Sequence, residues 1–516
     1  MHRMLLAFCI TCLGAAACPA EDRPNIVFAF ADDLGKYASA YRDATAPSPN
    51  DLIETPNFDR IAREGALFHN AFAASPSCTP SRAAIVAGRH FFRNGSHSQL
   101  HHPWMKGFAD PWDEVRGFPL MLQEAGYHIG WSYKLHISED RLGGKQRNYV
   151  SAGRRFNSFS QNVMNADDRG AEKQKLLEEV RGNFRALLAD RGKEQPFYSW
   201  FNPPNPHRAW AQGSGKAIWG IDPEGLAGKL PPFLHDNETV REDFADYLGE
   251  GMAFDAAVGV LLEELERLGE VDNTLVVVIG NQGATGFARG KCNLYDFGSG
   301  VLLAARWPAR LKAAGSVETP VSLIDLAPTF LAAAGLQPSA DMNGQNLLPA
   351  LAGDTADPEA AFRGWALTGR ETHVNEAREG NLPYPMRAIR TGEYLYIVNF
   401  KPDRWPVAVP PLGGEANAKR RMDIDYGPTR DWFTAHETDP KYAQFWKLGF
   451  DRRPAEELYN VQKDPHQMHN LAGEAEHDAV RRDLREKLFA ELRENNDPRV
   501  AGEGDAFDRP PYAPFK

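Results

Sequence analysis

The stretch Asn25-Ile26-Val27-Phe28-Ala29-Phe30-Ala31-Asp32-Asp33 decides the fold class of this chain of 516 residues. Its first part is a short, mainly apolar run of the kind that forms a strand buried on both faces of a parallel sheet. Two carboxylates follow at the carboxyl end of that strand, which is the edge where open α/β sheets bind their ligands. The stretch therefore predicts an α/β domain with a site directly after this strand.

Outward from this strand, short apolar runs alternate with segments of helical periodicity. We expect strands at residues 126–130, 197–201 and 274–279, and helices at residues 58–64 and 248–268. This alternation predicts a large doubly wound α/β domain with a mixed or parallel sheet. Polar clusters follow several of the predicted strands, so we expect loops at one sheet edge to build the site.

Past about residue 365 the sequence becomes rich in Tyr, Arg and Pro. Residues 384–390 and 394–398 have the pattern of short antiparallel strands, and residues 477–495 have apolar positions at helical spacing. We therefore predict a catalytic domain at residues 21–365 and a smaller C-terminal antiparallel α+β domain at residues 366–516.

The first twenty residues have the pattern of a secretory signal peptide. A buried N-terminal helix is the alternative, but the apolar run from Leu5 to Ala17 is too short to span a bilayer and polar, Pro-containing sequence follows it. Cys9, Cys12 and Cys18 lie in this segment, so a disulfide scaffold is excluded for the rest of the chain. We expect residues 1–20 to be removed, the mature protein to be periplasmic or secreted, and no membrane span.

The composition is that of a soluble globular protein, with 25% charged and 42% hydrophobic residues. A net charge of -11 offers no general attraction for a polyanion. We therefore expect no nucleic-acid partner, and any anionic substrate must be held by a local cluster of Lys, Arg and His.

The most specific motif is Ser77-Cys78-Thr79-Pro80-Ser81-Arg82. Pro suits the first turn of a helix, so Cys78 is expected at the positive N-terminal end of a helix running towards Ala87, where an anionic ester is favoured. A free structural Cys beside a capped helix is the alternative. The segment resembles the sulfatase family, whose Cys-x-Pro-Ser-Arg element marks its Cys for oxidation to formylglycine.

The resemblance extends over nearly the whole mature chain and is greatest to the sulfamidase branch, the heparan N-sulfatases and their bacterial relatives. It implies an alkaline-phosphatase-like fold, hydrolysis of sulfuric esters or sulfamates of sulfated saccharides, and a formylglycine-generating maturation enzyme as partner. His101 and His102 would bind substrate. The segments that carry the branch resemblance are His101-His102, Asn202 to Arg208, Tyr384 to Arg387 and Asn399 to Lys401.

The resemblance also implies a Ca²⁺ site. Asp32 and Asp33 match the first pair of ligands, and the side chain at position 78, Cys78 after its modification, is another. The second pair should begin with Asp, but this chain has Asn281 and Gln282 there. Amide oxygens can ligate Ca²⁺, although the loss of one negative charge should weaken binding.

Five further side chains match the family's catalytic groups: Arg82, Lys134, His136, His207 and Lys291. The resemblance implies that a hydroxyl of the hydrated aldehyde at position 78 attacks sulfur while Lys134, Lys291 and Arg82 neutralise the sulfate oxygens. His207 would protonate the leaving group, and His136 would take a proton from the remaining hydroxyl.

Arg370, Glu371 and His373 resemble the branch's substrate-facing loop, and we assign them to glycan recognition. An interdomain salt-bridge cluster is the alternative for these residue types. For the whole chain, a formylglycine phosphonate or phosphate monoester hydrolase and a degenerate homologue that only binds sulfated glycans remain the alternative functions.

Overall fold

The computed structural model describes residues 23–100, 104–311, 315–355, 357, 361–414, 417, 420–502 and 504–513. The predicted signal peptide and both His101 and His102 lie outside these residues. Among the residues described, no helix is long and apolar enough to cross a membrane.

The core of the fold is a seven-stranded mixed sheet with the first strand, β1, near its centre. Strand β1 pairs in parallel with β5 and β6, and β8 runs antiparallel to β6. The prediction of a doubly wound α/β domain is confirmed. In sheet order the strands are β4 (His128–Tyr133), β5 (Phe197–Asn202), β1 (Asn25–Ala31), β6 (Thr274–Gly280), β8 (Leu303–Arg306), β2 (Ala66–Phe68) and β9 (Gly315–Val317).

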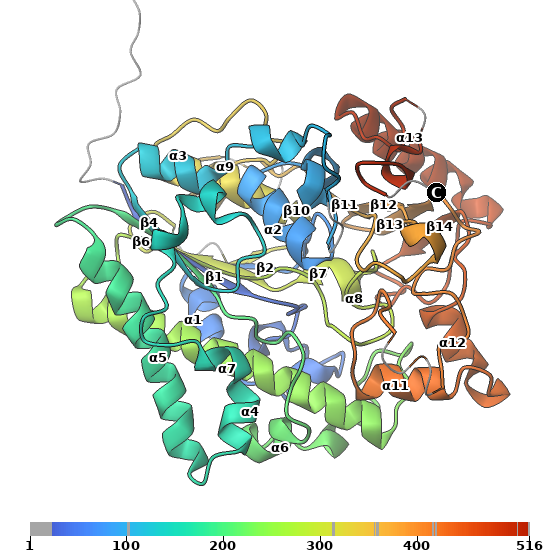
Figure 1. Ribbon diagram of the computed structural model, residues 1–516, viewed down its shortest axis with the longest axis horizontal. Helices are drawn as coiled ribbons and strands as arrows, with labels where there is room; N and C mark the ends of the chain where they lie inside the picture. Colours follow the sequence, from blue (N-terminus) through green and yellow to red (C-terminus); the bar gives the residue numbers. More distant parts are fainter. Residues whose placement is uncertain are drawn as a thin grey trace, which may run out of the picture.

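Helices cover both faces of this sheet (Figure 1). The residues of β1 alternate between two apolar cores, with Val27 and Ala29 in one and Ile26 and Phe28 in the other, so the strand is apolar on both faces. On one face lie α1 (Pro56–Glu64), α4 (Phe159–Met164), α5 (Arg169–Asp190), α6 (Ser214–Trp219) and α7 (Glu238–Leu268); on the other lie α2 (Cys78–Ala87), α3 (Phe118–Glu124) and α9 (Leu326–Ala333).

Helix α7 begins ten residues before the predicted start at residue 248. The Asn237 side chain caps it by accepting a hydrogen bond from the Val240 N–H at 3.1 Å. Its first turns carry buried carboxylates, among them Asp243 and Asp246, which hold neighbouring segments. These acids interrupt the apolar periodicity, so the pattern indicates only the later part of the helix.

The C-terminal region forms a separate four-stranded antiparallel sheet beside the main one (Figure 1). Leu488 of α13 packs with Ile389 and Tyr396 of this sheet, as the predicted terminal helix requires. The expected smaller α+β unit is confirmed. Its elements are β11 (Trp365–Arg370), β12 (Met386–Thr391), β13 (Tyr394–Asn399), α11 (Pro428–Ala435), α12 (Ala443–Gly449), β14 (Glu456–Asn460) and α13 (Asp478–Glu494).

A small sheet connects the two units. Strand β3 (Ala71–Phe72) pairs with β7 (Gly300–Val301) and β10 (Val321–Ser322), and the short α8 (Asp296–Ser299) precedes β7. Arg390 of the C-terminal sheet forms an ion pair of 3.0 Å with Asp296 of α8. This pairing fixes the C-terminal unit against the loops that follow the central strands.

Candidate active site

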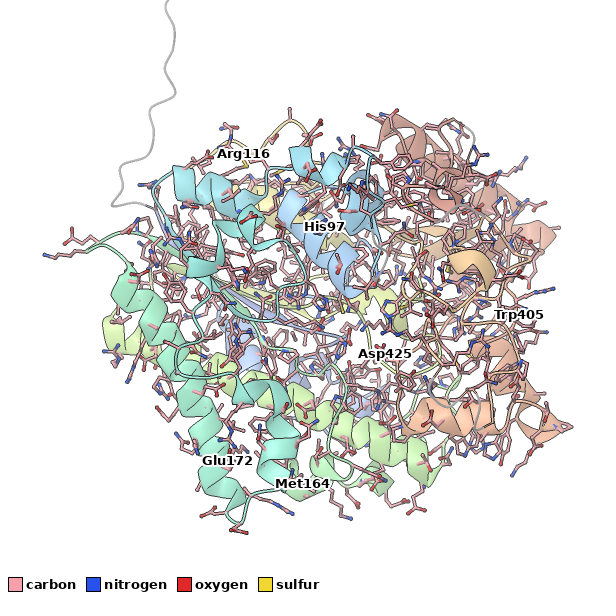
Figure 2. All side chains as sticks on the ribbon, viewed as in Figure 1. His97, Arg116, Met164, Glu172, Trp405 and Asp425 are labelled. Atoms are coloured by element: carbon pink, nitrogen blue, oxygen red, sulfur yellow. The ribbon has the colours of Figure 1, made fainter. Side chains whose placement is uncertain are left out.

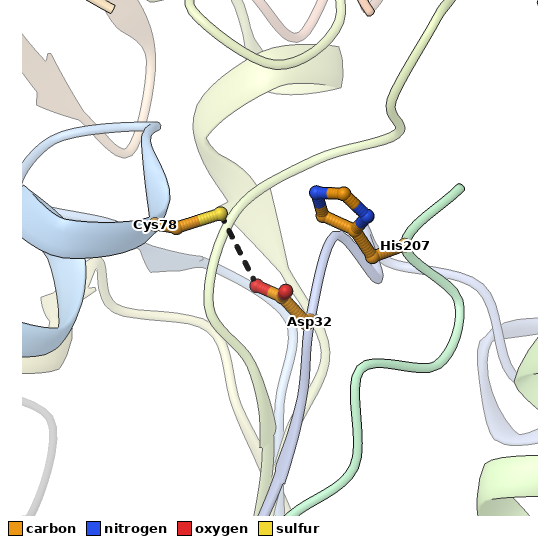
Figure 3. Close-up of side chains that lie close together, drawn as sticks. All are labelled: Asp32, Cys78 and His207. Carbon is orange, nitrogen blue, oxygen red and sulfur yellow. Dashed lines mark hydrogen bonds between the residues drawn. The ribbon is translucent and has the colours of Figure 1, made fainter. Parts of the chain in front are cut away.

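Helix α2 begins at Cys78, as the motif predicts. Ser77 before it is extended, with φ −153°, and the thiol is 1% exposed. Its Sγ lies 3.5 Å from Asp32 Oδ1 (Figure 3). Burial, together with the negative charge of Asp32, raises the pKa of the Cys78 thiol to about 11. An unmodified Cys78 is therefore a neutral thiol and a weak nucleophile.

Pairing of β1 with β6 brings together the four predicted metal-ligating side chains that follow these two strands. Ala31 is in register with Gly280, so the residues that follow the two strands meet. Asn281 Nδ2 donates to Asp32 Oδ1 at 2.7 Å, and Gln282 Nε2 donates to Asp33 Oδ1 at 2.5 Å and to the sulfur of position 78 at 3.2 Å. One cluster thus contains two carboxylates, two amides and the thiol.

Two lysines neutralise the carboxylates. Lys134 Nζ forms an ion pair with Asp32, and Lys291 Nζ lies 3.0 Å from Asp33 Oδ2. Burial opposes ionisation of Asp32, but Lys134 and Arg82 outweigh it and hold the pKa of that carboxyl well below its usual range. Burial likewise disfavours the Lys291 ammonium, yet its carboxylate neighbours raise the pKa well above the ordinary value. The Asp32 carboxylate and the Lys291 ammonium therefore stay charged.

Arg82 reaches the same cluster from the second turn of α2. It is fully buried, and its Nη1 donates to Asn202 Oδ1 at 2.7 Å while its guanidinium lies 4.2 Å from the centre of the Phe30 ring. Its Nη2 lies 3.6 Å from Asp32 Oδ1. Among the described residues, Arg82 Nε and Nη2 have no hydrogen-bond partner. These N–H groups are suited to an anionic ligand.

His207 faces the cluster from the loop after β5. Its Nε2 lies 3.9 Å from Asp33 Oδ2, and Figure 3 shows the ring beside Asp32 and Cys78. Its Nδ1 lies 2.5 Å from the carbonyl oxygen of Arg208, which can only accept, so Nδ1 donates. Burial and the charges of the nearby lysines lower the pKa of the His207 imidazole. With Nδ1 protonated, Nε2 is the nitrogen that faces the site.

Left-handed backbone is concentrated at the site. Asp33, Tyr133, His136 and Cys292 all have positive φ, at 71°, 69°, 55° and 73°. Tyr133 is not a glycine, and its hydroxyl is held by hydrogen bonds with Glu179 and Asn183. The turn is therefore kept without Gly, as expected where surrounding contacts fix a disfavoured conformation. It leaves His136 with an exposed side chain.

The C-terminal unit contributes two residues to the cluster. His373 is 2% exposed, with Nδ1 2.8 Å from Ser77 Oγ and Nε2 3.8 Å from Asp425 Oδ1. Asp425, labelled in Figure 2, lies with its Oδ2 2.9 Å from Lys291 Nζ and accepts a hydrogen bond from Thr285. Burial opposes ionisation of this carboxyl, but Lys291 and His373 hold its pKa well below the usual range.

Sequence reasoning did not identify Asp425. It lies in an irregular segment between β13 and α11, where no periodicity places a side chain, and the neighbouring acid Asp423 serves a different network. Its only signal is a carboxylate in a loop, which is common on protein surfaces.

Arg370 and Glu371 lie in buried ion-pair networks. Arg370 forms an ion pair with Asp423 and donates to the carbonyl of Cys292 in the other unit. Glu371 pairs with Arg387 at 2.8 Å and with Arg499 at 2.6 Å. The ion pairs all lie within the C-terminal unit, and the hydrogen bond from Arg370 to the Cys292 carbonyl is the contact among these that crosses to the catalytic unit. A role in glycan recognition stays a prediction for both, without a contact that supports it.

Residues 24–336, more than half of the chain, match the family model described as Sulfatase. The chain belongs to the sulfatase family. Over 96% of its length this sulfatase is 28% identical to human N-sulphoglucosamine sulphohydrolase, with 94% of that protein covered. It is 24% identical to N-acetylglucosamine-6-O-sulfatase of Bacteroides thetaiotaomicron, over 96% of this chain and 92% of that one.

A similar solved structure is described as a complex with its substrate D-glucosamine-2-N,6-O-disulfate. It superposes with a TM-score of 0.63 at 20% identity and covers 94% of this chain and 99% of that one. The likeness confirms the expected sulfatase fold. The predicted family and the prediction of a sulfatase enzyme are confirmed as well.

Proposed function

We propose that this sulfatase releases sulfate from sulfated saccharides, as esters or sulfamates, through formylglycine made from Cys78 and with Ca²⁺ bound. The observation that carries the proposal is the position of Cys78 at the N-terminal end of α2, with Asp32 3.5 Å and Lys134 Nζ 3.7 Å from its sulfur. An anionic ester bound at this side chain would be stabilised both by the positive end of the helix dipole and by the nearby cationic groups. Two of its relatives, N-sulphoglucosamine sulphohydrolase and N-acetylglucosamine-6-O-sulfatase, are named for sulfated amino sugars.

The donor set fits a hard divalent cation. Two carboxylates, Asp32 and Asp33, accept hydrogen bonds from the amides of Asn281 and Gln282. The Asn281 Oδ1 accepts from the Asp33 backbone N–H at 2.8 Å, and within the described part of the chain the buried Gln282 Oε1 has no hydrogen-bond partner. Oxygen ligands of this kind suit Ca²⁺. Asp32, Asp33, Asn281, Gln282 and the modified side chain at position 78 would hold it, and when bound the ion adds positive charge against the sulfate oxygens.

The side chains of the site have separable tasks. Formylglycine supplies, when hydrated, a hydroxyl nucleophile next to sulfur. Arg82, with two N–H groups lacking partners among the described residues, and the ammonium groups of Lys134 and Lys291 hold the sulfate oxygens. Burial and, after it, the charges of Lys291 and Lys134 lower the pKa of His207. A bound anion counters the lysine charges, and in the proposed mechanism this imidazole takes up a proton with the substrate.

His207 then gives its Nε2 proton to the leaving oxygen or nitrogen, because a basic leaving atom needs a proton as its bond to sulfur breaks. His136, exposed at the end of the Lys134 loop, is the group that removes a proton from the position-78 side chain. His101, His102 and His373 are proposed to contact the saccharide. Of these, His373 lies in the described site.

The remaining finer proposals concern maturation and location. We propose that residues 1–20 are a signal peptide, that the mature chain is periplasmic or secreted, and that a formylglycine-generating enzyme acts on Cys78. The 1% exposure of that thiol in the folded chain is consistent with modification before folding.

The test is mass spectrometry of the Cys78 peptide after expression with an active maturation enzyme, followed by a substrate panel. We expect the mass of formylglycine and release of sulfate from sulfated amino sugars. Unmodified Cys78 would contradict the mechanism. Release of the phenol from an aryl phosphate or an aryl phosphonate monoester at a higher rate than from an aryl sulfate would favour the phosphonate or phosphate monoester hydrolase alternative instead. Binding of sulfated sugar without release of sulfate would favour the non-catalytic homologue.

A further inference from the structure

Arg208, the residue after the candidate acid His207, is held in one buried position by its hydrogen bonds. Arg208 makes a two-pronged contact with Asp243, with Nη1–Oδ1 and Nη2–Oδ2 both 2.7 Å, and its Nε donates to the Thr285 carbonyl at 3.1 Å. Its guanidinium also lies 3.8 Å from the centre of the Trp210 ring. A planar fork held at three nitrogens has one position, unlike a flexible ammonium.

The surroundings leave room for this guanidinium and for little else. A Cβ added at Gly286 would lie 2.2 Å from Arg208 Nε, and one added at Gly427 would lie 2.4 Å from Arg208 Cζ. Gly286 follows β6 in the catalytic unit, and Gly427 directly precedes α11 in the C-terminal unit. Both units therefore shape the space that holds Arg208.

The acceptor of the fork also anchors the C-terminal unit. Asp243 Oδ2 accepts hydrogen bonds from Thr429, at 2.6 Å from its hydroxyl and 3.2 Å from its backbone N–H, in the first turn of α11. The side chains of Arg208 and Asp243 are 8% and 2% exposed, so this pair is desolvated and sensitive to loss of either partner.

The same residue holds the catalytic ring through its backbone. The Arg208 carbonyl accepts from His207 Nδ1 at 2.5 Å, and this bond selects the tautomer in which Nε2 faces Asp33. We propose that Arg208 is a positioning residue for His207, and that its pairing with Asp243 makes the position of His207 depend on the docking of α11. The role assigned to His207 here rests on the proposed function.

The test is a double-mutant cycle with two substrates, an alkyl or sugar sulfate and an activated aryl sulfate. We expect Arg208→Gln to lower turnover of the sugar sulfate by about 10- to 100-fold and of the aryl sulfate by less than about 3-fold, since acid assistance matters most for basic leaving groups. In a His207→Ala background, Arg208→Gln should add almost nothing, because residues acting as a unit are non-additive. A merely structural role would give equal losses on both substrates and additive effects, which would overturn the inference.

Two further variants serve as controls for a loss of folding. Arg208→Gln combined with Asp243→Asn removes both buried charges and should show the same leaving-group signature. Arg181→Gln, which breaks an ion-pair network with Glu263 and Glu264 between α5 and α7, should change neither rate. Thr429→Val probes the α11 contact alone, and we expect it to lower sugar-sulfate turnover selectively but less than Arg208→Gln. An unchanged substrate ratio in Thr429→Val would refute the dependence on α11.

A readout without turnover separates this inference from the proposed function. Crystal structures of the wild type and of Arg208→Gln should show the His207 ring displaced from Asp33 in the variant. An unmoved ring overturns the positioning role, even if the enzyme is active. A displaced ring in a protein that releases no sulfate would support positioning while rejecting the proposed function.

Discussion

Lys291 Nζ lies between two carboxylates from different units, 3.0 Å from Asp33 Oδ2 and 2.9 Å from Asp425 Oδ2. The site is therefore completed across the interface between the catalytic sheet and the C-terminal unit. The resemblance implies an Asp at position 281, where this chain has Asn281, and Asp425 brings a carboxylate to the site beside Lys291. The predictions below test how each group in this arrangement contributes.

Cys78→Ala and Cys78→Ser should both abolish sulfate release. The residue supplies the Cβ carbon that becomes the aldehyde, and a hydroxyl of the hydrated aldehyde is the nucleophile, while its small side chain at the start of α2 contributes little core volume, so the fold should persist. Circular dichroism and a sulfate-release assay on the same preparations check this. Residual turnover equal to that of the wild type would eliminate position 78 from the mechanism.

His207→Ala should slow substrates with basic leaving groups far more than activated aryl sulfates. The expected loss for sugar sulfates is about 100-fold or more, the usual size of general acid assistance, with a much smaller loss for the aryl ester. Steady-state kinetics on a series of leaving groups measures the difference. Equal losses across the series would reassign His207 to binding.

Asn281→Asp should strengthen Ca²⁺ binding. A third carboxylate in direct contact with the ion is expected to add about 1 to 3 kcal/mol, as for hydrogen bonds and contacts to charged groups. Titration calorimetry of the metal-free proteins measures this without reference to activity. If the wild type binds no Ca²⁺ and is inactive while the variant gains both, the natural chain is a degenerate sulfatase; if neither responds, the assignment of residues 281 and 282 as ligands is wrong.

Asp246 should make the stability of the fold depend on pH. Burial raises the pKa of this carboxyl to about 7, although it accepts backbone hydrogen bonds from Gly213 and Gly215. The unfolded value is about 4, so between about pH 4 and 7 the folded chain binds this proton more tightly, and its stabilising effect is lost as pH rises through that window.

Asp246→Asn removes this titration. The free energy of unfolding of the variant relative to the wild type should rise by about 1 to 3 kcal/mol between pH 5 and pH 8, measured by urea unfolding at each pH. A constant difference between the two proteins at both pH values would show that Asp246 does not titrate in this range.

The sequence predicted the parts of the site that follow regular elements. Asp32 and Asp33 come directly after a strand that is apolar on both faces. Cys78 begins a helix whose first turn is indicated by Pro80, so the local pattern predicts the position of each of the three residues. Asp425 could not be found in this way, because an irregular segment carries it and only tertiary packing brings it to Lys291. Local patterns give the direction of a side chain relative to its own element but not its distant partner.

The same limit of local patterns explains why the ion-pair partners of Arg370 and Glu371 could not be predicted from the sequence. Their residue types suit either a substrate or an internal ion pair, and their partners Asp423 and Arg499 are distant in sequence, so these ion pairs could be found only from the tertiary structure. The start of α7 is comparable, since buried acids that cap neighbouring segments interrupt the apolar spacing from which its length would be read.

The hydrogen bond between Ser77 and His373 has a consequence for the timing of biosynthesis. It joins residues 296 positions apart, beside a thiol that the finished fold leaves 1% exposed. At roughly 5 to 20 residues per second, the ribosome needs roughly 15 to 60 seconds to make the chain between them. The proposed oxidation of Cys78 therefore has an interval in which the nascent segment is accessible, and slowing elongation between these positions should raise the fraction of chains that mature.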